Sequence, residues 1–87
     1  GKNFPNPFNM STEIFFTIDK ERSVQLFVHD LIGNKITDLV NDTYAPGQHS
    51  IQWNGTNQYG NHVSSGIYIY TIVSNAYKES GRMILLK

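Results

Sequence analysis

The sequence predicts an all-β fold, and three features support that prediction. Apolar residues alternate with polar ones along most of the chain, as at Ile14, Phe16 and Ile18, which is the period of a strand with one buried face. Turn-forming pairs such as Pro46-Gly47 and Asn54-Gly55 interrupt the alternating runs. No segment has an apolar stripe of helical spacing that is long enough to form a helix.

The strands are expected where this alternation is clearest. Residues 11–18, "STEIFFTI", form the first such run, and shorter runs follow over residues 24–28 and 49–53, with a less regular one over residues 36–40. The later run "GIYIYTIV" alternates isoleucine with tyrosine, so both of its faces are apolar or aromatic. The closing "RMILLK" is also apolar on both faces. Such two-sided runs are typical of strands that are covered on both sides.

The turns between these runs indicate how the strands are connected. In "DLIGNK", which begins at Asp30, Gly33 is expected to take the positive φ that closes a hairpin. In "APGQ", Pro46 and Gly47 suit the two central positions of a type II turn. About seven short strands at this turn density predict an antiparallel β-sandwich of immunoglobulin-like type, although the cysteine pair of antibody domains is absent.

Length and composition limit the classes of function. The 87 residues are expected to form a single domain, residues 1–87, excised from a larger secreted protein. Seven basic and seven acidic side chains cancel, which argues against a nucleic-acid partner. No apolar run approaches the roughly 18 residues of a membrane span, so no membrane insertion is expected. The lack of cysteine excludes a disulfide scaffold and thiolate chemistry.

The leading segment, "FPNPFN" at residues 4–9, is unusual because two prolines separate two phenylalanines. Pro5 and Pro7 cannot donate to a sheet ladder, so the segment is expected along a sheet edge. Phe4 and Phe8 are expected to tuck into one open end of the sandwich and to anchor the segment there.

The residues that could carry chemistry do not form a recognisable site. His29, His49 and His62 lack the spacing of metal ligands, and the asparagine-rich loop after Trp53 has no carboxylate to attract calcium. The acidic residues are scattered, and Ser64 and Ser65 do not lie in a nucleophile elbow. We therefore expect no enzyme activity, no metal and no cofactor.

In their order along the chain, these segments resemble the type A C-terminal sorting domain of type IX secretion substrates. The resemblance covers residues 3–87 and implies a seven-stranded immunoglobulin-like sandwich. The segments that carry it are "FPNPFN", "VQLFVHDLIGNKITDLV", "APGQHSIQWNGTNQYGNHVSSGIYIYTI" and "RMILLK". Its structural motif would comprise Phe4, Pro5, Asn6, Pro7, Phe8, Asp30, Gly33, Pro46, Gly47, Trp53 and Gly55.

The resemblance also implies a function. Such a domain directs its cargo, the N-terminal part of the parent chain, from the periplasm of a Gram-negative bacterium across the outer membrane. The partners would be the type IX outer-membrane translocon and a sortase-like peptidase, which cuts before Asn3 and leaves the cargo secreted or at the cell surface. Recognition would lie between Gly66 and Lys87, with the candidate residues Gly66, Tyr68, Tyr70, Arg82, Met83, Ile84, Leu85, Leu86 and Lys87.

Some residues depart from the family pattern, and other interpretations stay open. Asn54 and Asn57 stand where aspartate is frequent, and Phe4 stands where tyrosine is frequent. The chain also resembles the immunoglobulin-like domain of the flagellar hook-capping protein, a structural module. A passive spacer is another possibility, and so is a carbohydrate-binding module that stacks sugars on Trp53, Tyr59, Tyr68 and Tyr70. If residues 66–73 or 82–87 form a sheet edge, recognition by strand addition is expected.

Overall fold

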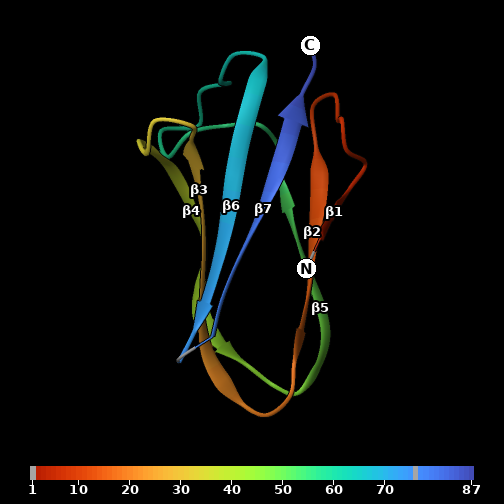
Figure 1. Cartoon of the computed structure of the whole chain (residues 1–87), viewed down its shortest axis with the longest axis vertical. Coiled ribbons are helices and arrows are strands. Elements are labelled where there is room, and N and C mark those ends of the chain that lie inside the picture. The colour runs from red at the N-terminus through yellow and green to blue at the C-terminus, as the bar shows by residue number, and fades with distance from the viewer. Residues whose placement is uncertain (1, 76) are drawn as a thin grey trace.

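The computed structural model describes residues 2–75 and 77–87, and it contains seven strands in two antiparallel sheets (Figure 1). The smaller sheet has the order β1-β2-β5 and the larger sheet has the order β4-β3-β6-β7. The predicted all-β sandwich is therefore confirmed. The strands are β1 (Lys2–Phe4), β2 (Thr12–Ile18), β3 (Arg22–Asp30), β4 (Lys35–Tyr44), β5 (Gly47–Trp53), β6 (Gly66–Ser74) and β7 (Tyr77–Leu85).

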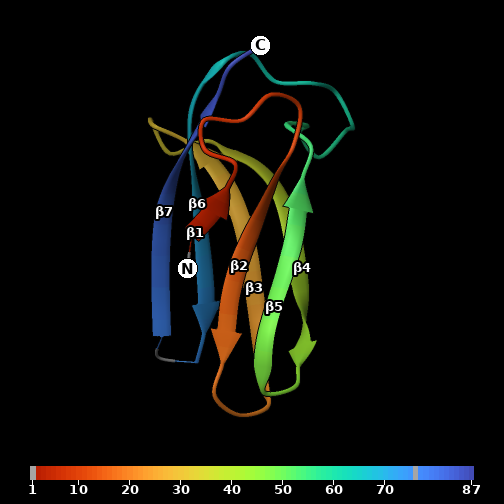
Figure 2. The ribbon, with the colours of Figure 1, turned by 90° about the vertical axis from the view of Figure 1, so that its right-hand side faces the viewer.

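The smaller sheet forms because β2 and β5 bury alternate residues against the core. Ile14, Phe16 and Ile18 of β2 are buried, and the residues between them are exposed. The register pairs Thr12 with Trp53 and Ile18 with Gly47. The short strand β1 adds to the other edge of β2 (Figure 2).

The larger sheet has β6 in its interior, between β3 and β7. This position explains why residues 66–73 are apolar on both faces: Tyr68, Tyr70 and Ile72 point into the core, and the residues between them lie on the outer face. The irregular spacing of β4 also has a structural cause, because its pairing with β3 shifts register twice, at Leu26/Phe27 and at Val28/His29.

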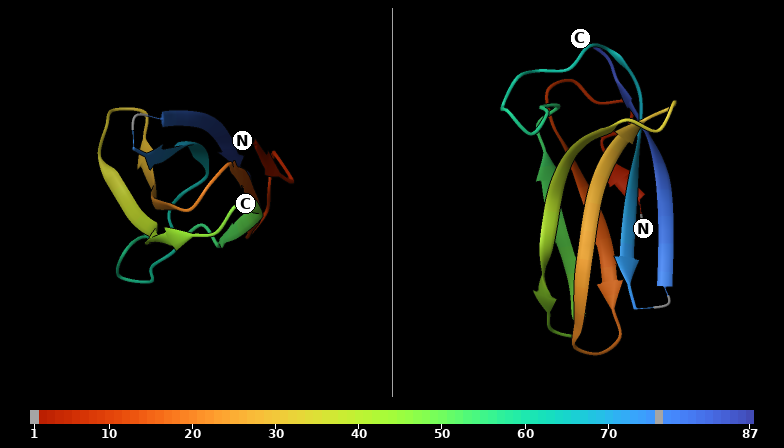
Figure 3. Two further views of the ribbon diagram at one scale, coloured as in Figure 1. Left: turned by 90° about the horizontal axis from the view of Figure 1, so that it is seen from below. Right: turned by 90° about the vertical axis from the view of Figure 1, so that its left-hand side faces the viewer.

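The core lies between the two sheets, which Figure 3 shows from two further directions. Burying such large apolar side chains supplies the main favourable term in folding. Trp53 and Tyr70 are the largest of the fully buried side chains. The buried apolar residues are Phe8, Ile14, Phe16, Ile18, Val24, Leu26, Val28, Val40, Trp53, Tyr68, Tyr70, Ile72, Met83 and Leu85.

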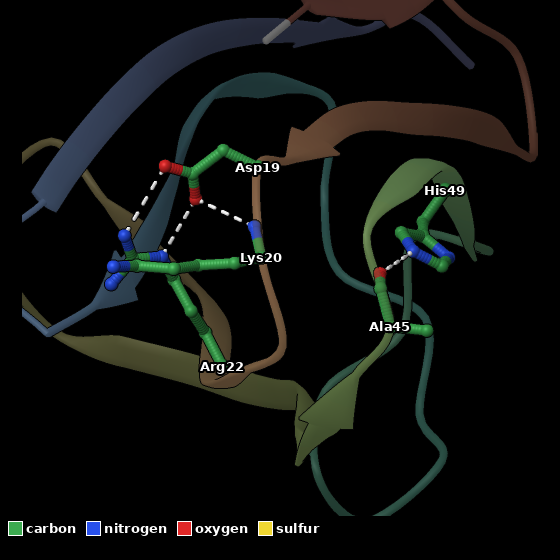
Figure 4. A network of polar contacts seen from close by, with 5 residues as sticks. All are labelled: Asp19, Lys20, Arg22, Ala45 and His49. Carbon is green, nitrogen blue, oxygen red and sulfur yellow. Dashed lines mark hydrogen bonds and ion pairs between the residues drawn. The ribbon is translucent and has the colours of Figure 1, made fainter.

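Two glycines take the backbone conformation that their turns require. Gly33 has a φ of 94° in the loop between β3 and β4, as predicted. Gly47 has a φ of 130° where β5 begins, after the Ala45-Pro46 turn. At this turn the Nε2 atom of His49 lies 2.7 Å from the carbonyl oxygen of Ala45, so the imidazole fastens the loop between β4 and β5 (Figure 4).

Candidate functional site

The leading segment crosses from one sheet to the other. Residues 2–4 pair with β2, with Lys2 opposite Phe15. Four residues later the chain pairs with β7 instead: the amide of Phe8 donates to the carbonyl of Ile84 (2.8 Å), and the amide of Leu86 donates to the carbonyl of Phe8 (2.9 Å). The bridge between Phe8 and Leu85 is parallel. The segment therefore closes the upper part of one open side of the sandwich (Figure 2).

The Asn6 side chain extends this pairing by one further step. Its Nδ2 atom donates to the carbonyl of Arg82 (3.0 Å), and its Oδ1 atom accepts from the amide of Ile84 (2.9 Å). A carboxamide carries N–H donors and a C=O acceptor on the same carbon, so it can supply the donor and the acceptor of a strand residue at this edge. The segment between Pro5 and Pro7 thus pairs with β7 without using the backbone amides that the prolines lack.

The two phenylalanines of the leading segment have different environments. Phe8 is 2 % exposed, which confirms the expectation that its ring tucks into the sandwich. Phe4 is 70 % exposed, so the expectation that it also tucks into the sandwich is wrong. The physical reason is the alternation within β1, where the inward-facing residue is Asn3. Its amide Nδ2 donates to Thr12 Oγ1 at 3.1 Å.

Four motifs that lie far apart in the sequence meet at the upper end of the core. The ring of Phe8 lies 5.6 Å from that of Trp53, whose other neighbour is Tyr68 at 5.3 Å, both measured between centroids. Leu85 from β7 is bridged to Phe8 and is fully buried. A Cβ atom added at Gly55 would lie 3.4 Å from Leu85 Cδ2, which is an ordinary contact, so the glycine is favoured there by its φ of 69°. We call Phe8, Trp53, Tyr68 and Leu85 the closing cluster.

Polar contacts around the closing cluster fix its position. The indole Nε1 of Trp53 donates to the carbonyl of Thr56 (2.9 Å), and the hydroxyl of Tyr68 donates to the carbonyl of Ser64 (2.6 Å). At the C-terminus, the Lys87 amide donates to Ser65 Oγ (3.0 Å), and its ammonium group donates to the Val63 carbonyl. The long link between β5 and β6 is thus tied both to the core and to the last residue of the chain.

The nine candidate recognition residues fall into two groups. Tyr68, Tyr70, Met83 and Leu85 are buried and point into the core. Arg82, Leu86 and Lys87 are exposed, and Gly66 and Ile84 are half-buried. A partner that binds the folded domain has direct access only to the second group.

The structure contradicts the carbohydrate-binding interpretation. Trp53, Tyr68 and Tyr70 are 1 %, 7 % and 1 % exposed, and only Tyr59 among the four proposed rings is open to solvent. A sugar needs the exposed face of a ring for stacking. The predicted platform therefore does not exist in the folded domain.

Two turns at the upper end share a hydrogen-bond pattern that sequence reasoning missed. In Asp30–Asn34 the carboxylate Oδ1 accepts from the amides of Ile32 and Asn34, and in residues 57–61 the Asn57 Oδ1 accepts from those of Tyr59 and Asn61. The backbone hydrogen bonds of the two turns also correspond, because in each turn the first residue donates to the fifth and the fourth donates to the first. The signal is visible as "DLIGN" and "NQYGN". Because Asn57 serves the turn as Asp30 does, an aspartate is not needed at position 57.

The electrostatics of the domain are mild. The guanidinium of Arg22 hydrogen-bonds both carboxylate oxygens of Asp19, at 2.8 and 3.2 Å, and lowers the pKa of that carboxyl to about 2 (Figure 4). Burial raises the pKa of the Tyr70 hydroxyl, and the nearby Tyr77 adds to the shift. Among residues 2–75 and 77–87, no three His, Cys, Asp or Glu side chains are placed to hold a metal ion. The same residues contain no helix long and apolar enough to cross a membrane.

Comparison with solved structures finds similar folds. The chain resembles part of dimeric latent PorU from Porphyromonas gingivalis, with 20 % identity, a TM-score of 0.77, and coverage of 98 % of this chain and 9 % of that one. It also resembles part of PorZ from the same organism, with 16 % identity, a TM-score of 0.69, and coverage of 99 % and 11 %. PorZ is described as an essential bacterial surface component of the type IX secretion system.

The chain thus spans about a tenth of the length of each of these proteins, and at such identities the likeness shows the fold alone. Comparison with curated protein sequences gives no match. The sequence matches the FlgD Ig-like domain family over residues 10–78, well over half of its length. Together with the seven-stranded sandwich, this match shows that the chain belongs to the FlgD Ig-like domain family.

Proposed function

We propose that the chain is a type A C-terminal sorting domain, which directs a cargo protein across the bacterial outer membrane by the type IX system. The proposal rests on the order of motifs along the sequence and on how the structure assembles them. It is supported by the likeness of the fold to part of PorZ, which is described as a surface component of that system.

One observation carries the proposal. The family match covers residues 10–78 and leaves out both the leading segment and the last nine residues. Those two segments carry the features that separate the resemblance to sorting domains from the resemblance to hook-capping proteins. They also bind each other, through Asn6 to Arg82 and Ile84, and through Phe8 to Ile84 and Leu86. A surface that the leading segment and the last nine residues form together is suited to let a receptor distinguish sorting domains from other domains of the same fold.

The same arrangement suits the partners that the proposal requires. The cargo would precede Lys2, and the sortase-like peptidase would cut before Asn3. The strand β1 is held by its pairing with β2 and by the hydrogen bond from Asn3 to Thr12. A cut upstream of it leaves the fold intact. The translocon would act on the folded domain after its passage through the periplasm, and the cargo would end at the cell surface or outside the cell.

A second candidate is a structural module within a secreted protein. The family match favours it, because the residues that carry the match form the general sandwich and need no receptor. The two candidates differ in one measurable respect. A sorting domain is sufficient to export a foreign cargo, and a structural module is not.

The test uses a fluorescent protein with an inner-membrane signal peptide at its N-terminus and residues 1–87 at its C-terminus. The fusion is expressed in a bacterium with a type IX system and in a matched strain without the translocon. We expect fluorescence in the medium or at the surface only in the first strain. Retention of a folded, protease-resistant fusion in the periplasm of both strains would overturn the proposal and favour the structural module.

A further inference from the structure

The two halves of the edge strand β7 differ in what covers them. Its upper half pairs with the leading segment through Asn6 and Phe8. On the same side of the lower half, Tyr77 to Gly81, no strand pairs with it among the residues that the structure describes. Edge strands with open backbone groups are ready templates for another chain, and proteins usually cover or interrupt them. Here only the upper half of the edge is paired (Figure 2), and Lys2 lines a depression together with Tyr77 and Glu79 of the lower half.

The open half presents backbone groups in a regular row. Ile84 uses both its amide and its carbonyl towards the leading segment. The register between β6 and β7 has no shift over its whole length. Alternate residues of a strand direct their backbone N–H and C=O groups to the same edge. Like Ile84, Ser80 and Lys78 therefore direct both groups to the open side, together with the amide of Arg82. A second strand placed there would continue the ladder that Phe8 begins.

The side chains beside this row have a definite charge. Lys78 and Arg82 are exposed and lie on the outer face of the sheet, four positions apart. No ion pair involves either of them among the described residues. A strand laid along this edge would place two of its own side chains, also about four positions apart, opposite these cations. Carboxylates at those positions would complement them.

The inner face of residues 77–81, which is turned towards the smaller sheet, borders a groove between β7 and β2. Two adjoining depressions of about 580 and 510 Å³ both include Thr17 and Tyr77 in their linings. Phe15 and Ile18 contribute apolar surface to them, and charged side chains also line them, Asp19 and Arg22 in the first and Lys2 and Glu79 in the second. A strand on the edge of β7 would direct its alternate side chains towards this groove. An apolar side chain of that strand would contact the surface of Phe15 and Ile18.

We infer that the lower edge of β7 binds an extended peptide segment of the export machinery by strand addition. Its carboxylates, about four positions apart, lie opposite Lys78 and Arg82, and an apolar side chain enters the groove beside Tyr77. This inference rests on the proposed sorting function and specifies the site of recognition. It moves that site from residues 82–87, whose edge is already covered, to residues 78–82.

The test is a pair of substitutions at Ser80 in the fluorescent fusion. Ser80→Pro removes the outward amide, which donates to no other strand, and proline is tolerated at such an edge position. Ser80→Ala is the matched control, because both variants lose the hydroxyl contact with Thr71 (3.0 Å) and only one loses the amide. We expect at least a tenfold fall in export for Ser80→Pro relative to Ser80→Ala, with both fusions protease-resistant in the periplasm.

The double variant Lys78→Glu/Arg82→Glu tests the charge and keeps the backbone intact, so it also decides the case if Ser80→Pro does not fold. We expect it to lower export at least tenfold. Normal export of both the proline and the charge-reversal variants would overturn the inference and leave the sorting function standing. Loss of export with Ser80→Pro but not with Lys78→Glu/Arg82→Glu would support strand addition and overturn the inference that the partner segment is acidic. Retention of the unsubstituted fusion would overturn the sorting function and the inference together.

Discussion

The side-chain amide of Asn6 forms two hydrogen bonds with the backbone of β7, one with Ile84 at 2.9 Å and one with Arg82 at 3.0 Å. The residues are separated by more than seventy positions in the sequence, so this contact ties the first turn of the chain to its last strand. It lets a segment with two prolines act as part of a sheet. The contact therefore makes the leading segment an integral part of the fold.

This contact predicts the cost of changing Asn6. Asn6→Ala removes both hydrogen bonds and is expected to lower the free energy of unfolding by about 1–3 kcal/mol, at 0.5–1.5 kcal/mol for each bond. Asn6→Asp keeps an acceptor for Ile84 but places a carboxylate against the Arg82 carbonyl. Urea unfolding measures both changes, with Asn9→Ala, at an exposed asparagine of the same segment, as the control. Equal stability of Asn6→Ala and Asn9→Ala would contradict the role of the amide.

The unequal burial of the two phenylalanines gives a second prediction. Phe8→Ala empties a site within the closing cluster and is expected to cost about 3–5 kcal/mol, a large share of the stability of a domain of this size. Phe4→Ala removes an exposed ring and is expected to change the stability by less than about 0.5 kcal/mol. Thermal unfolding of the two variants compares them directly. If Phe8→Ala prevents folding, Phe8→Leu provides a milder step, expected to lie between the two.

Gly81 gives a third prediction because it lies directly opposite Tyr70 across β6 and β7. A Cβ atom at position 81 would lie 2.3 Å from the Tyr70 ring and hydroxyl, and the ring is 1 % exposed with little room to move. Gly81→Ala is therefore expected to destabilise the domain by about 1–3 kcal/mol through overpacking. The same substitution in a Tyr70→Leu background should cost less. Equal costs in both backgrounds, measured by urea unfolding, would show that the ring is not the cause.

Much of the fold could be predicted because the sheets use local signals. The alternation of Ile14, Phe16 and Ile18 fixed one face of β2, and the two-sided run at 66–73 indicated a covered strand. The ends of the strands were harder to predict from the sequence. β4 extends to Tyr44, beyond the apolar residues at 36–40, because its polar second half pairs with β3 through backbone groups. The three-residue strand β1 has no periodic signal at all.

The candidate site was harder to predict because long-range pairing decides it. Phe4 and Phe8 have similar sequence surroundings, and only the crossing from β2 to β7 buries one and exposes the other. Strand addition was expected only if residues 66–73 or 82–87 formed an edge. Residues 66–73 lie in the interior of the sheet, and the edge at residues 82–87 is covered by Asn6 and Phe8 from the other end of the sequence. No local pattern shows that the open part lies nearer the polar residues 78–81.

The ion pair in the turn between β2 and β3 gives a prediction about acid stability. The hydrogen bonds from Arg22 lower the pKa of Asp19 from its ordinary value of 3.8 to about 2. A carboxyl whose pKa is depressed in the folded state binds protons less readily there than in the unfolded state. Its stabilising contribution is therefore fully present above about pH 4 and is lost as the pH falls towards 2. Because the pair is exposed, the contribution is expected to be small and to weaken with salt.

The measurement is an NMR titration of the Asp19 side-chain carboxyl in the wild-type chain and in Arg22→Gln. We expect a midpoint near 2 in the wild type and a midpoint closer to 3.8 in the variant, since the first cause of the shift is then removed. Unfolding experiments between pH 2 and 5 should show a shallower pH dependence for the variant over the same interval. A wild-type midpoint near 3.8 would mean that the ion pair does not persist in solution. The turn would then be held by the pairing of β2 with β5 and of β3 with β4 and β6, and not by the charge of Asp19.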